Sequence, residues 1–150
     1  MKKLVALLLM CILCGCDGIC AWNACIKRNP HGAMLRSIED DLNSERAIGY
    51  LNPEIRLSFG KTNIKGQNLG TFVARKRTNG TNKTPEASCQ IAFLTAVKAL
   101  QDKATIKGGN AVINIHSFWR KIPEWSDTEY HCEHGALMSG VALRGTIVKQ

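Results

Sequence analysis

A seven-residue stretch near the end of the chain, TEYHCEH (residues 128–134), has the residue types of three different kinds of site. Cys132 stands next to one histidine, His131, and two residues before another, His134. Cysteine and histidine together are ligands for zinc or copper. A cysteine beside a histidine base can also act as a nucleophile, and any cysteine can be one half of a disulfide.

The alternation of side chains along a strand separates the residues of this stretch. If it forms a strand, Tyr130, Cys132 and His134 point to one face of the sheet, and His131 points to the other. The two histidines therefore cannot both join Cys132 in one site unless the strand contains a bulge. This favours a site in which Cys132 finds its partner elsewhere in the chain.

The partner that the pattern offers is Cys89, near the start of the clearest helix in the chain (residues 84–109). Thr84 is a favourable N-cap for this helix, and Pro85 suits its first position. Cys89 lies on the apolar stripe that would face a sheet, so it can meet Cys132. In an oxidising compartment the two would form a disulfide that closes a loop of about 43 residues, worth roughly 4 kcal/mol.

Two alternatives to the disulfide stay open. A metal site would recruit Cys89, Cys132, His134 and His116, although their spacing matches no compact zinc signature. A thiol-dependent enzyme would need a reactive cysteine beside a base, and residues 128–134 offer only neighbours along a strand. The sequence has no other catalytic motif and no nucleotide-binding loop, so we expect neither an enzyme nor a bound cofactor.

The first residues, MKKLVALLLMCILCGC (residues 1–16), have the pattern of a bacterial signal peptide. Two lysines precede an apolar run of about ten residues, which is too short to span a bilayer. LCGC resembles the lipobox of lipoproteins, so we predict that residues 1–16 end in a lipidation site at Cys16. Cleavage near residues 21–24 is the alternative. If Cys16 carries lipid, four other cysteines remain in the mature chain, and Cys20 and Cys25 would form a second pair.

The charge of the chain bears on its partners. It has 20 Lys and Arg against 12 Asp and Glu, a formal net charge of +8. A basic exported protein can contact an anionic component of the cell envelope. An exported protein seldom meets nucleic acid, so we expect no nucleic-acid partner. The predicted location is the periplasm or, through a lipid on Cys16, the surface of a membrane.

The hydrophobic patterns predict one α+β domain at residues 33–150, after a polar leader at residues 17–32. Residues 33–42 have helical spacing, and with residues 43–51 they are expected to form one or two short helices. The expected sheet is mostly antiparallel, with four to five strands and the long helix packed on one face. In this sheet Ile113 and Ile115 should share one face of their strand. The expected strands cover residues 54–60, 69–77, 110–121, 128–134 and 136–149.

Three stretches, SCQIAFLTAVKALQDKA, GGNAVINIHSF and TEYHCEHGALMSGVALRG, resemble a family of small exported bacterial proteins catalogued as an excinuclease ATPase subunit. The resemblance covers roughly residues 35–149. No nucleotide-binding motif in this sequence supports the ATPase label.

The chain is also distantly similar to the signalling domain of the Rcs envelope-stress sensor lipoprotein. The shared features are the SCQ start of the helix, a NAV strand that ends in His-Ser, and a G-x-A-L pattern in the last strand. This resemblance implies a disulfide between Cys89 and Cys132. A second bridge of that relative would fall at Ser117 and Met138, so it is missing from this sequence.

Together these observations predict a non-enzymatic protein of the bacterial cell envelope, a disulfide-stapled module that binds a ligand or senses stress. Its partner would be another envelope protein or an anionic envelope component. A periplasmic heavy-metal-binding protein is the first alternative, and a thiol-dependent enzyme is the second.

Overall fold

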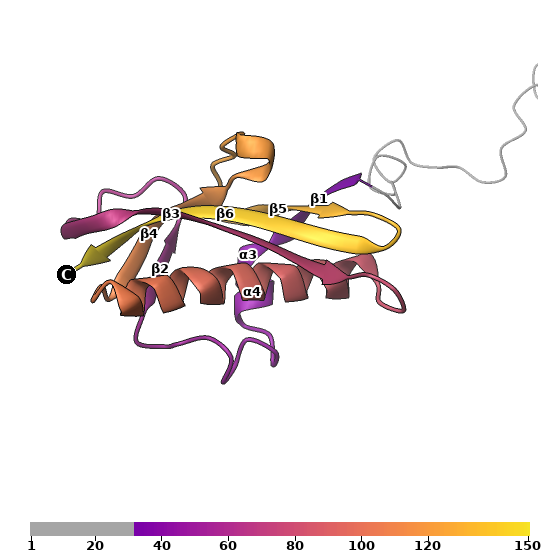
Figure 1. The fold of residues 1–150 in the computed structure, drawn as a ribbon, viewed down its shortest axis with the longest axis horizontal. Helices are drawn as coiled ribbons and strands as arrows, with labels where there is room; N and C mark the ends of the chain where they lie inside the picture. Colours follow the sequence, from indigo (N-terminus) through magenta and orange to yellow (C-terminus); the bar gives the residue numbers. More distant parts are fainter. Residues whose placement is uncertain (1–31) are drawn as a thin grey trace, which may run out of the picture.

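The computed structural model describes residues 32–150, which form one six-stranded sheet with a long helix, α4, packed on one face (Figure 1). The predicted signal peptide, the lipidation site Cys16 and the predicted pair of Cys20 and Cys25 lie outside the described residues. Along the chain the elements are β1 (Gly32–Ser37), α3 (Ile38–Leu42), β2 (Arg56–Phe59), β3 (Gln67–Asn79), α4 (Pro85–Ile106), β4 (Ala111–Ser117), η1 (Trp119–Lys121), β5 (Glu129–His134) and β6 (Met138–Lys149).

The sheet is built around β6. β3 runs antiparallel to β6 along its whole length, from Gln67 beside Lys149 to Asn79 beside Met138. The other edge of β6 is shared, because β5 pairs near its start and β4 pairs with its second half. β1 then pairs with β5, and β2 pairs with β4 in the one parallel pairing among the described strands. The sheet is therefore mixed and has six strands, where the sequence predicts four to five in a mostly antiparallel arrangement.

The long helix forms where the sequence predicts it because both of its ends are well specified. Thr84 is the N-cap and accepts a hydrogen bond from Ala87 N at 3.1 Å, while Pro85 takes the first helical position. Gly108 follows the helix with a φ of 71°, a left-handed conformation that glycine adopts without strain. Neither α4 nor any other helix within residues 32–150 is long and apolar enough to cross a membrane. The largest fully buried side chains of α4 are Phe93, Leu94, Val97, Leu100 and Gln101.

The helix predicted at residues 33–42 is wrong in its first half. Gly32–Ser37 is strand β1, which pairs antiparallel with β5 at the edge of the sheet. Pairing with β5 satisfies the backbone groups of this segment, and that tertiary contact outweighs its helical spacing. Only Ile38–Leu42 is helical, and the second short helix predicted after it is a series of turns.

A β-bulge in β4 changes the faces predicted for that strand. Asn114 has a φ of 53°, and the pairing of β4 with β6 shifts between Ile113 and His116. The extra residue puts Ile115 in the core under α4 and Ile113 in a small cluster apart from it. The prediction that these two isoleucines share a face is therefore wrong. His116 follows Ile115 and so lies on the face opposite α4.

Candidate functional site

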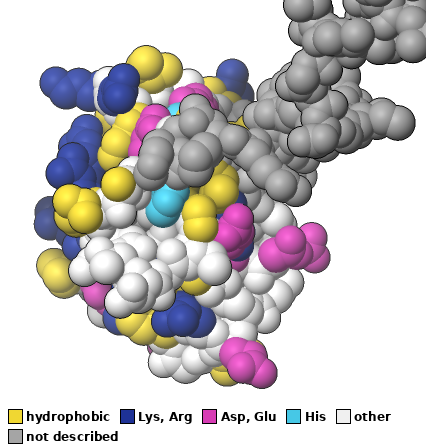
Figure 2. Space-filling model, turned by 90° about the vertical axis from the view of Figure 1, so that its right-hand side faces the viewer, with side chains coloured by type: hydrophobic (Ala, Val, Ile, Leu, Met, Phe, Trp, Pro, Cys, Tyr) yellow, Lys and Arg dark blue, Asp and Glu magenta, His cyan; other side chains and the backbone are white. Residues whose placement is uncertain are grey.

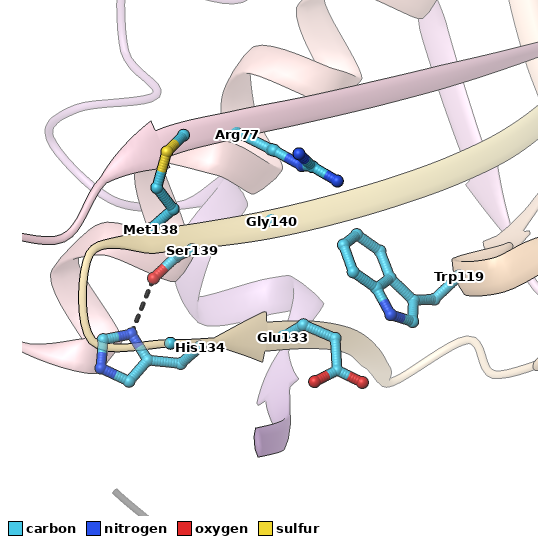
Figure 3. A pocket seen from close by; sticks show the side chains of 8 residues that line it. Arg77, Trp119, Glu133, His134, Met138, Ser139 and Gly140 are labelled. Carbon is cyan, nitrogen blue, oxygen red and sulfur yellow. Dashed lines mark hydrogen bonds between the residues drawn. The ribbon is translucent and has the colours of Figure 1, made fainter. Parts of the chain in front are cut away.

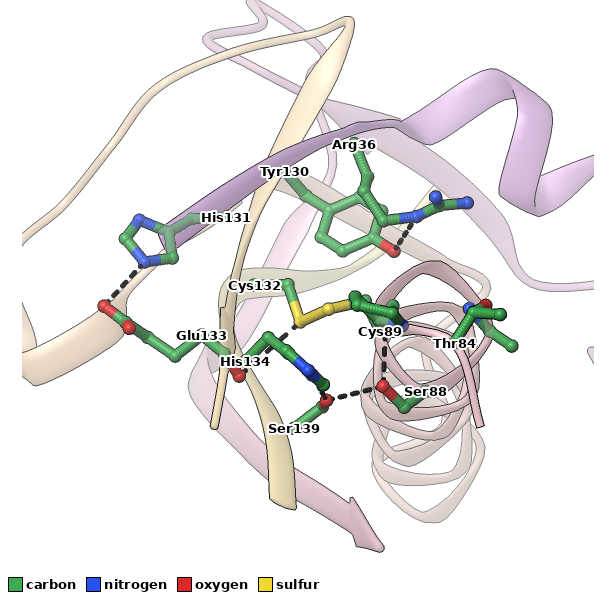
Figure 4. The surroundings of a disulfide bond; sticks show 12 residues. Arg36, Thr84, Ser88, Cys89, Tyr130, His131, Cys132, Glu133, His134 and Ser139 are labelled. Carbon is green, nitrogen blue, oxygen red and sulfur yellow. Dashed lines mark hydrogen bonds and ion pairs between the residues drawn. A yellow bond between two sulfur atoms is a disulfide. The ribbon is translucent and has the colours of Figure 1, made fainter. Parts of the chain in front are cut away.

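Cys89 and Cys132 form a disulfide that joins the start of α4 to β5 (Figure 4). Their Cα atoms are 5.9 Å apart, and neither residue is exposed to solvent. This is the pairing that strand alternation and the apolar stripe of the helix predict. While the bond is intact neither sulfur is a thiolate, so neither can bind a metal ion or act as a nucleophile.

His134 shares a face of β5 with Cys132 but belongs to a hydrogen-bonded chain that leads to α4 (Figure 4). Its Nδ1 is 2.7 Å from Ser139 Oγ. That oxygen is 2.6 Å from Ser88 Oγ, and Ser88 donates its hydroxyl hydrogen to the carbonyl of Pro85 at 3.0 Å. Because a serine hydroxyl has only one hydrogen, Ser88 must accept from Ser139. Ser139 must then accept from His134 for the same reason. In a serine nucleophile the hydroxyl donates its hydrogen to the histidine, whereas here the histidine donates to the serine. Ser139 is also fully buried.

The predicted metal ligands do not come together in the structure. Cys89 and Cys132 are bonded to each other, and His116 lies on the other face of the sheet from His134. Within residues 32–150 no group of three or more His, Cys, Asp or Glu side chains is placed to hold a metal ion. The arrangement therefore gives no support to the metal alternative.

A buried charge network ties β1, α3, α4 and β5 together on the α4 side. Asp41 is 1% exposed and accepts hydrogen bonds from Arg36 Nη2 and from the hydroxyl of Tyr130, each at 2.6 Å. Gln90 of α4 donates a further one at 3.0 Å. The hydrogen bond to Asp41 raises the pKa of Arg36, and burial raises the pKa of Tyr130, so both stay protonated. The network positions elements and offers no free base.

The opposite face of the sheet, called the open face below, is covered only in part. Its cover is the segment that joins β4 to β5 (residues 118–128), seen with η1 above the sheet in Figure 1. Trp125 of this segment stacks on His116 with ring centroids 3.8 Å apart. Trp119 lies nearly parallel to His131 with centroids 6.4 Å apart. Burial under this cover lowers the pKa of His116.

His131 lies between two glutamates on the open face. Its Nδ1 is 2.9 Å from Glu124 Oε2, and its Nε2 is 3.1 Å from Glu133 Oε1. Because both ring nitrogens already have partners, His131 is not available as a metal ligand or a base.

Beside this group the open face has a hollow of about 280 Å³ that is lined in part by Gly140 (Figure 3). Gly140 of β6 pairs with Arg77 of β3 on one side and with Glu133 of β5 on the other. A cationic and an anionic side chain therefore flank a residue that has none. Trp119 forms one wall, because a Cβ on Gly140 would lie 2.9 Å from its Cη2 atom, and Met138 lies at another.

Two hydrogen-bond donors at this hollow lack acceptors within residues 32–150. The indole nitrogen of Trp119 is buried and has no hydrogen-bond partner there. Arg77 makes no side-chain hydrogen bond or ion pair with the part of the chain that the structure describes. Arg77 is exposed, so solvent can satisfy its guanidinium, whereas a buried donor without a partner, such as Trp119 Nε1, is rare in folded proteins.

A basic strip runs along the β3 edge of the sheet. β3 carries the run RKR (residues 75–77) and pairs only with β6 among the described strands. Lys103 and Lys107 of α4 lie over the ring of Phe72 of β3, at 5.2 and 5.9 Å from its centroid. Figure 2 shows Lys and Arg side chains gathered along the left side of the molecule in that view. Such a strip can attract an anionic surface.

No family model, no curated protein and no solved structure matches this chain. The resemblances to the excinuclease-type proteins and to the Rcs sensor therefore stay predictions that rest on the motifs alone. What the site can do follows from its own residues.

The sequence alone could not assemble the hollow. Arg77, Gly140 and Glu133 lie on three strands and meet only through the register of those strands, which no local pattern specifies. The sequence predicts Trp119 within a strand, whereas β4 ends at Ser117 and a 3₁₀ turn follows. One signal was available, because a glycine inside an apolar strand such as Gly140 indicates a close approach.

Proposed function

We propose that the chain is a non-enzymatic binding module of the bacterial cell envelope, stapled by its disulfide. The observation that carries this proposal is the fully buried Cys89–Cys132 bond, because disulfides persist in oxidising compartments such as the periplasm and are rare in the cytosol. The signal-like residues 1–16 support the same location, and a lipid on Cys16 would hold the domain at a membrane surface.

Binding is favoured over catalysis by where the reactive groups lie. The two cysteines are bonded to each other. Ser139 donates its hydrogen to Ser88 and not to a histidine base, so it is not activated as a nucleophile. Arg77, which makes no ion pair among the described residues, and Glu133 instead line the open-face hollow. A stress sensor and a plain binding protein both need such a ligand site, so the proposal covers both. The basic strip supports an anionic envelope component as a further contact.

The test is the state of the cysteines in protein taken from cells. The full chain is produced in a bacterium, the envelope fraction is isolated, and free thiols are alkylated before and after reduction. We expect Cys89 and Cys132 to be alkylated only after reduction, and Cys16 to carry a lipid mass increment. The Cys16→Ser variant is the matched control, since it should lose the increment and keep the disulfide. Alkylation of both partners without reductant, in protein that stays in the cytoplasm, would overturn the proposal.

A further inference from the structure

We propose that the outer edge of β3 binds an extended acidic segment of another envelope protein, which joins the sheet as an added strand. The segment alternates acidic and apolar side chains. Its acidic side chains face Arg75 and Arg77, and its apolar ones face a groove beside α4. This inference rests on the proposed function, because it names the kind of partner that the binding module takes.

The outer edge of β3 has backbone groups without partners. β3 is 13 residues long and pairs on one side only, with β6, whereas the opposite edge is divided between the shorter strands β1 and β2. In an antiparallel pair every second residue directs its N–H and C=O away from the partner strand. Between Thr71 and Thr78 these outward groups have no hydrogen-bond partner among residues 32–150. This stretch, about 27 Å long, is an edge on which another strand can pair.

A groove of about 380 Å³ lies between this edge and α4. Phe72 of β3 and Ala99 and Leu100 of α4 give it apolar walls. Lys76 and Lys103 also line it, and their aliphatic stems can pack there while the ammonium groups stay in water. Because side chains alternate along a strand, an added strand would direct every second side chain into this groove. Short apolar side chains suit these positions.

The other face of the same edge is cationic. Ala74 lies in the core under α4, so Arg75 and Arg77 lie on the open face by alternation. Arg144 of β6 pairs with Val73 and lies on the open face as well. Neither β3 nor β6 has an acidic residue, and none of these arginines forms an ion pair with the described residues. Carboxylates on the open-face side of an added strand would therefore meet cations.

Two other occupants of this edge match it less well. A second copy would bring together two RKR runs (residues 75–77) from strands that have no acidic residue, and like charges on paired strands are unfavourable. An anionic bilayer would match the charge, but its headgroups do not present the alternating donors and acceptors of a strand. An acidic extended segment satisfies both the charge and the backbone groups.

The test follows the backbone signals of residues 71–78 in ¹H–¹⁵N NMR spectra of the oxidised protein. The probe is a nine-residue peptide, acetyl-TVEVEVEVT-amide, and we expect a saturable shift concentrated in these signals. The neutral peptide acetyl-TVQVQVQVT-amide keeps the apolar pattern and should bind about tenfold more weakly or worse. No saturable shift with the acidic peptide, or equal binding of the two peptides, overturns the proposal.

A third peptide tests whether the segment pairs as a strand. Acetyl-TVEPEPEVT-amide keeps the three carboxylates, but its prolines have no N–H and cannot continue a β-ladder. It should bind about tenfold more weakly than acetyl-TVEVEVEVT-amide or worse. Equal binding would show that charge alone holds the peptide, and it would overturn the added strand.

The other two occupants are tested with the same signals. Vesicles of phosphatidylglycerol and a dilution series without peptide should both leave the signals of residues 71–78 unchanged. A shift with the vesicles and none with the acidic peptide would identify a lipid surface and overturn the proposal. A dependence on protein concentration would identify pairing with a second copy and also overturn it.

Two double variants assign the cations. Arg75→Gln/Arg77→Gln should weaken binding of the acidic peptide about tenfold and leave binding of the neutral peptide unchanged. Arg56→Gln/Lys121→Gln is the matched control, because it removes two exposed cations that lie outside β3 and do not line the groove. An equal loss in the control would reveal a general charge effect and overturn the assignment.

The two proposals fail separately. If Cys89 and Cys132 are bonded in the envelope fraction but the acidic peptide does not bind, the docking edge is overturned and the envelope module stands. If the protein stays in the cytoplasm with free thiols, the envelope module is overturned whatever the NMR titration gives.

Discussion

The two faces of the sheet differ in what holds them together. Under α4 the side chains are packed without solvent, with the ring of Phe93 stacked on Tyr130 at 3.9 Å and the disulfide at one end. The open face is covered by one short segment that rests on polar rings, as Trp125 does on His116. The α4 face is held by apolar burial, a covalent bond and the buried Arg36–Asp41 ion pair, and the open face by ring stacking and partly exposed hydrogen bonds.

This difference indicates that the two faces contribute unequally to stability. A fully buried large apolar side chain is worth about 1.5–3 kcal/mol, and α4 buries several of them against the sheet. A partly exposed polar contact, such as that of His131 with Glu124, is worth about 0–1 kcal/mol even as an ion pair. Because the α4 face supplies most of the apolar burial, we expect substitutions on the open face to cost less stability. Changes on the α4 face should therefore alter stability most.

The largest effect is expected from removal of the disulfide. The double variant Cys89→Ala/Cys132→Ala should lower the free energy of unfolding by about 4 kcal/mol, because the bond spans 43 residues of sequence. Urea denaturation followed by circular dichroism measures the change. The reduced wild-type protein is the control, since it loses the bond and keeps both side chains. An unchanged midpoint in both samples would contradict the assignment of cohesion to the α4 face.

The next effect is expected from the buried charge network. Asp41→Asn should cost about 3 kcal/mol, because it leaves the Arg36 charge partly buried without its counter-ion. Asp102→Asn removes an exposed carboxylate, paired with Lys98 at 2.8 Å, and should barely move the urea midpoint. Similar losses in the two variants would remove the distinction between buried and exposed charges.

A smaller effect is expected on the open face from Gly140→Ala. The new Cβ would lie 2.9 Å from Trp119 Cη2, so the indole ring must move away from β6. This should lower the free energy of unfolding by about 1 kcal/mol. The indole emission should shift to longer wavelength, as measured against the same change in a Trp119→Phe background. Gly135→Ala is the control, because its Cβ would approach nothing closer than 3.4 Å. An unchanged emission spectrum would contradict the packing of Trp119 on β6.

The smallest effect is expected from acidification of the open face. Burial lowers the pKa of His116 in the folded protein, so the unfolded chain binds this proton more readily. The stability linked to the neutral ring is complete above the unfolded pKa of about 6.5, and it is lost as the pH falls below that value. The urea midpoint should therefore fall less between about pH 7.5 and about pH 5 in His116→Phe than in the wild type. Equal declines in the two proteins would contradict this role.

The α4 face could largely be predicted from the sequence because its determinants are local. The cap at Thr84 and the apolar stripe specify the helix, and alternation specifies which face of β5 carries Cys132. The wrong prediction on this face is the helix expected where β1 lies. Met34 and Ile38 have helical spacing, but pairing with β5 makes Gly32–Ser37 a strand. The parallel pairing of β2 with β4 is likewise a contact between distant segments.

The open face resisted prediction because its determinants are not local. One extra residue at Asn114 puts Ile113 on the face of β4 opposite to Ile115. The amino-acid composition of this segment does not predict a bulge. The hollow needs the register of three strands and the turn that carries Trp119 over Gly140. Sequence patterns predict the strands that carry Arg77, Gly140 and Glu133, but only their pairing places Arg77 and Glu133 on either side of Gly140.

The position of β6 has a consequence for the order of folding. β3, β4 and β5 all pair with this strand and α4 packs on it, yet it is the last strand of the sheet in sequence. β3, β4 and β5 cannot complete their pairing until Met138–Lys149 has been synthesised, and sheets closed by such distant contacts form slowly. If the chain is exported, as we propose, this late completion of the sheet would keep the polypeptide unfolded until it has been translocated across the membrane.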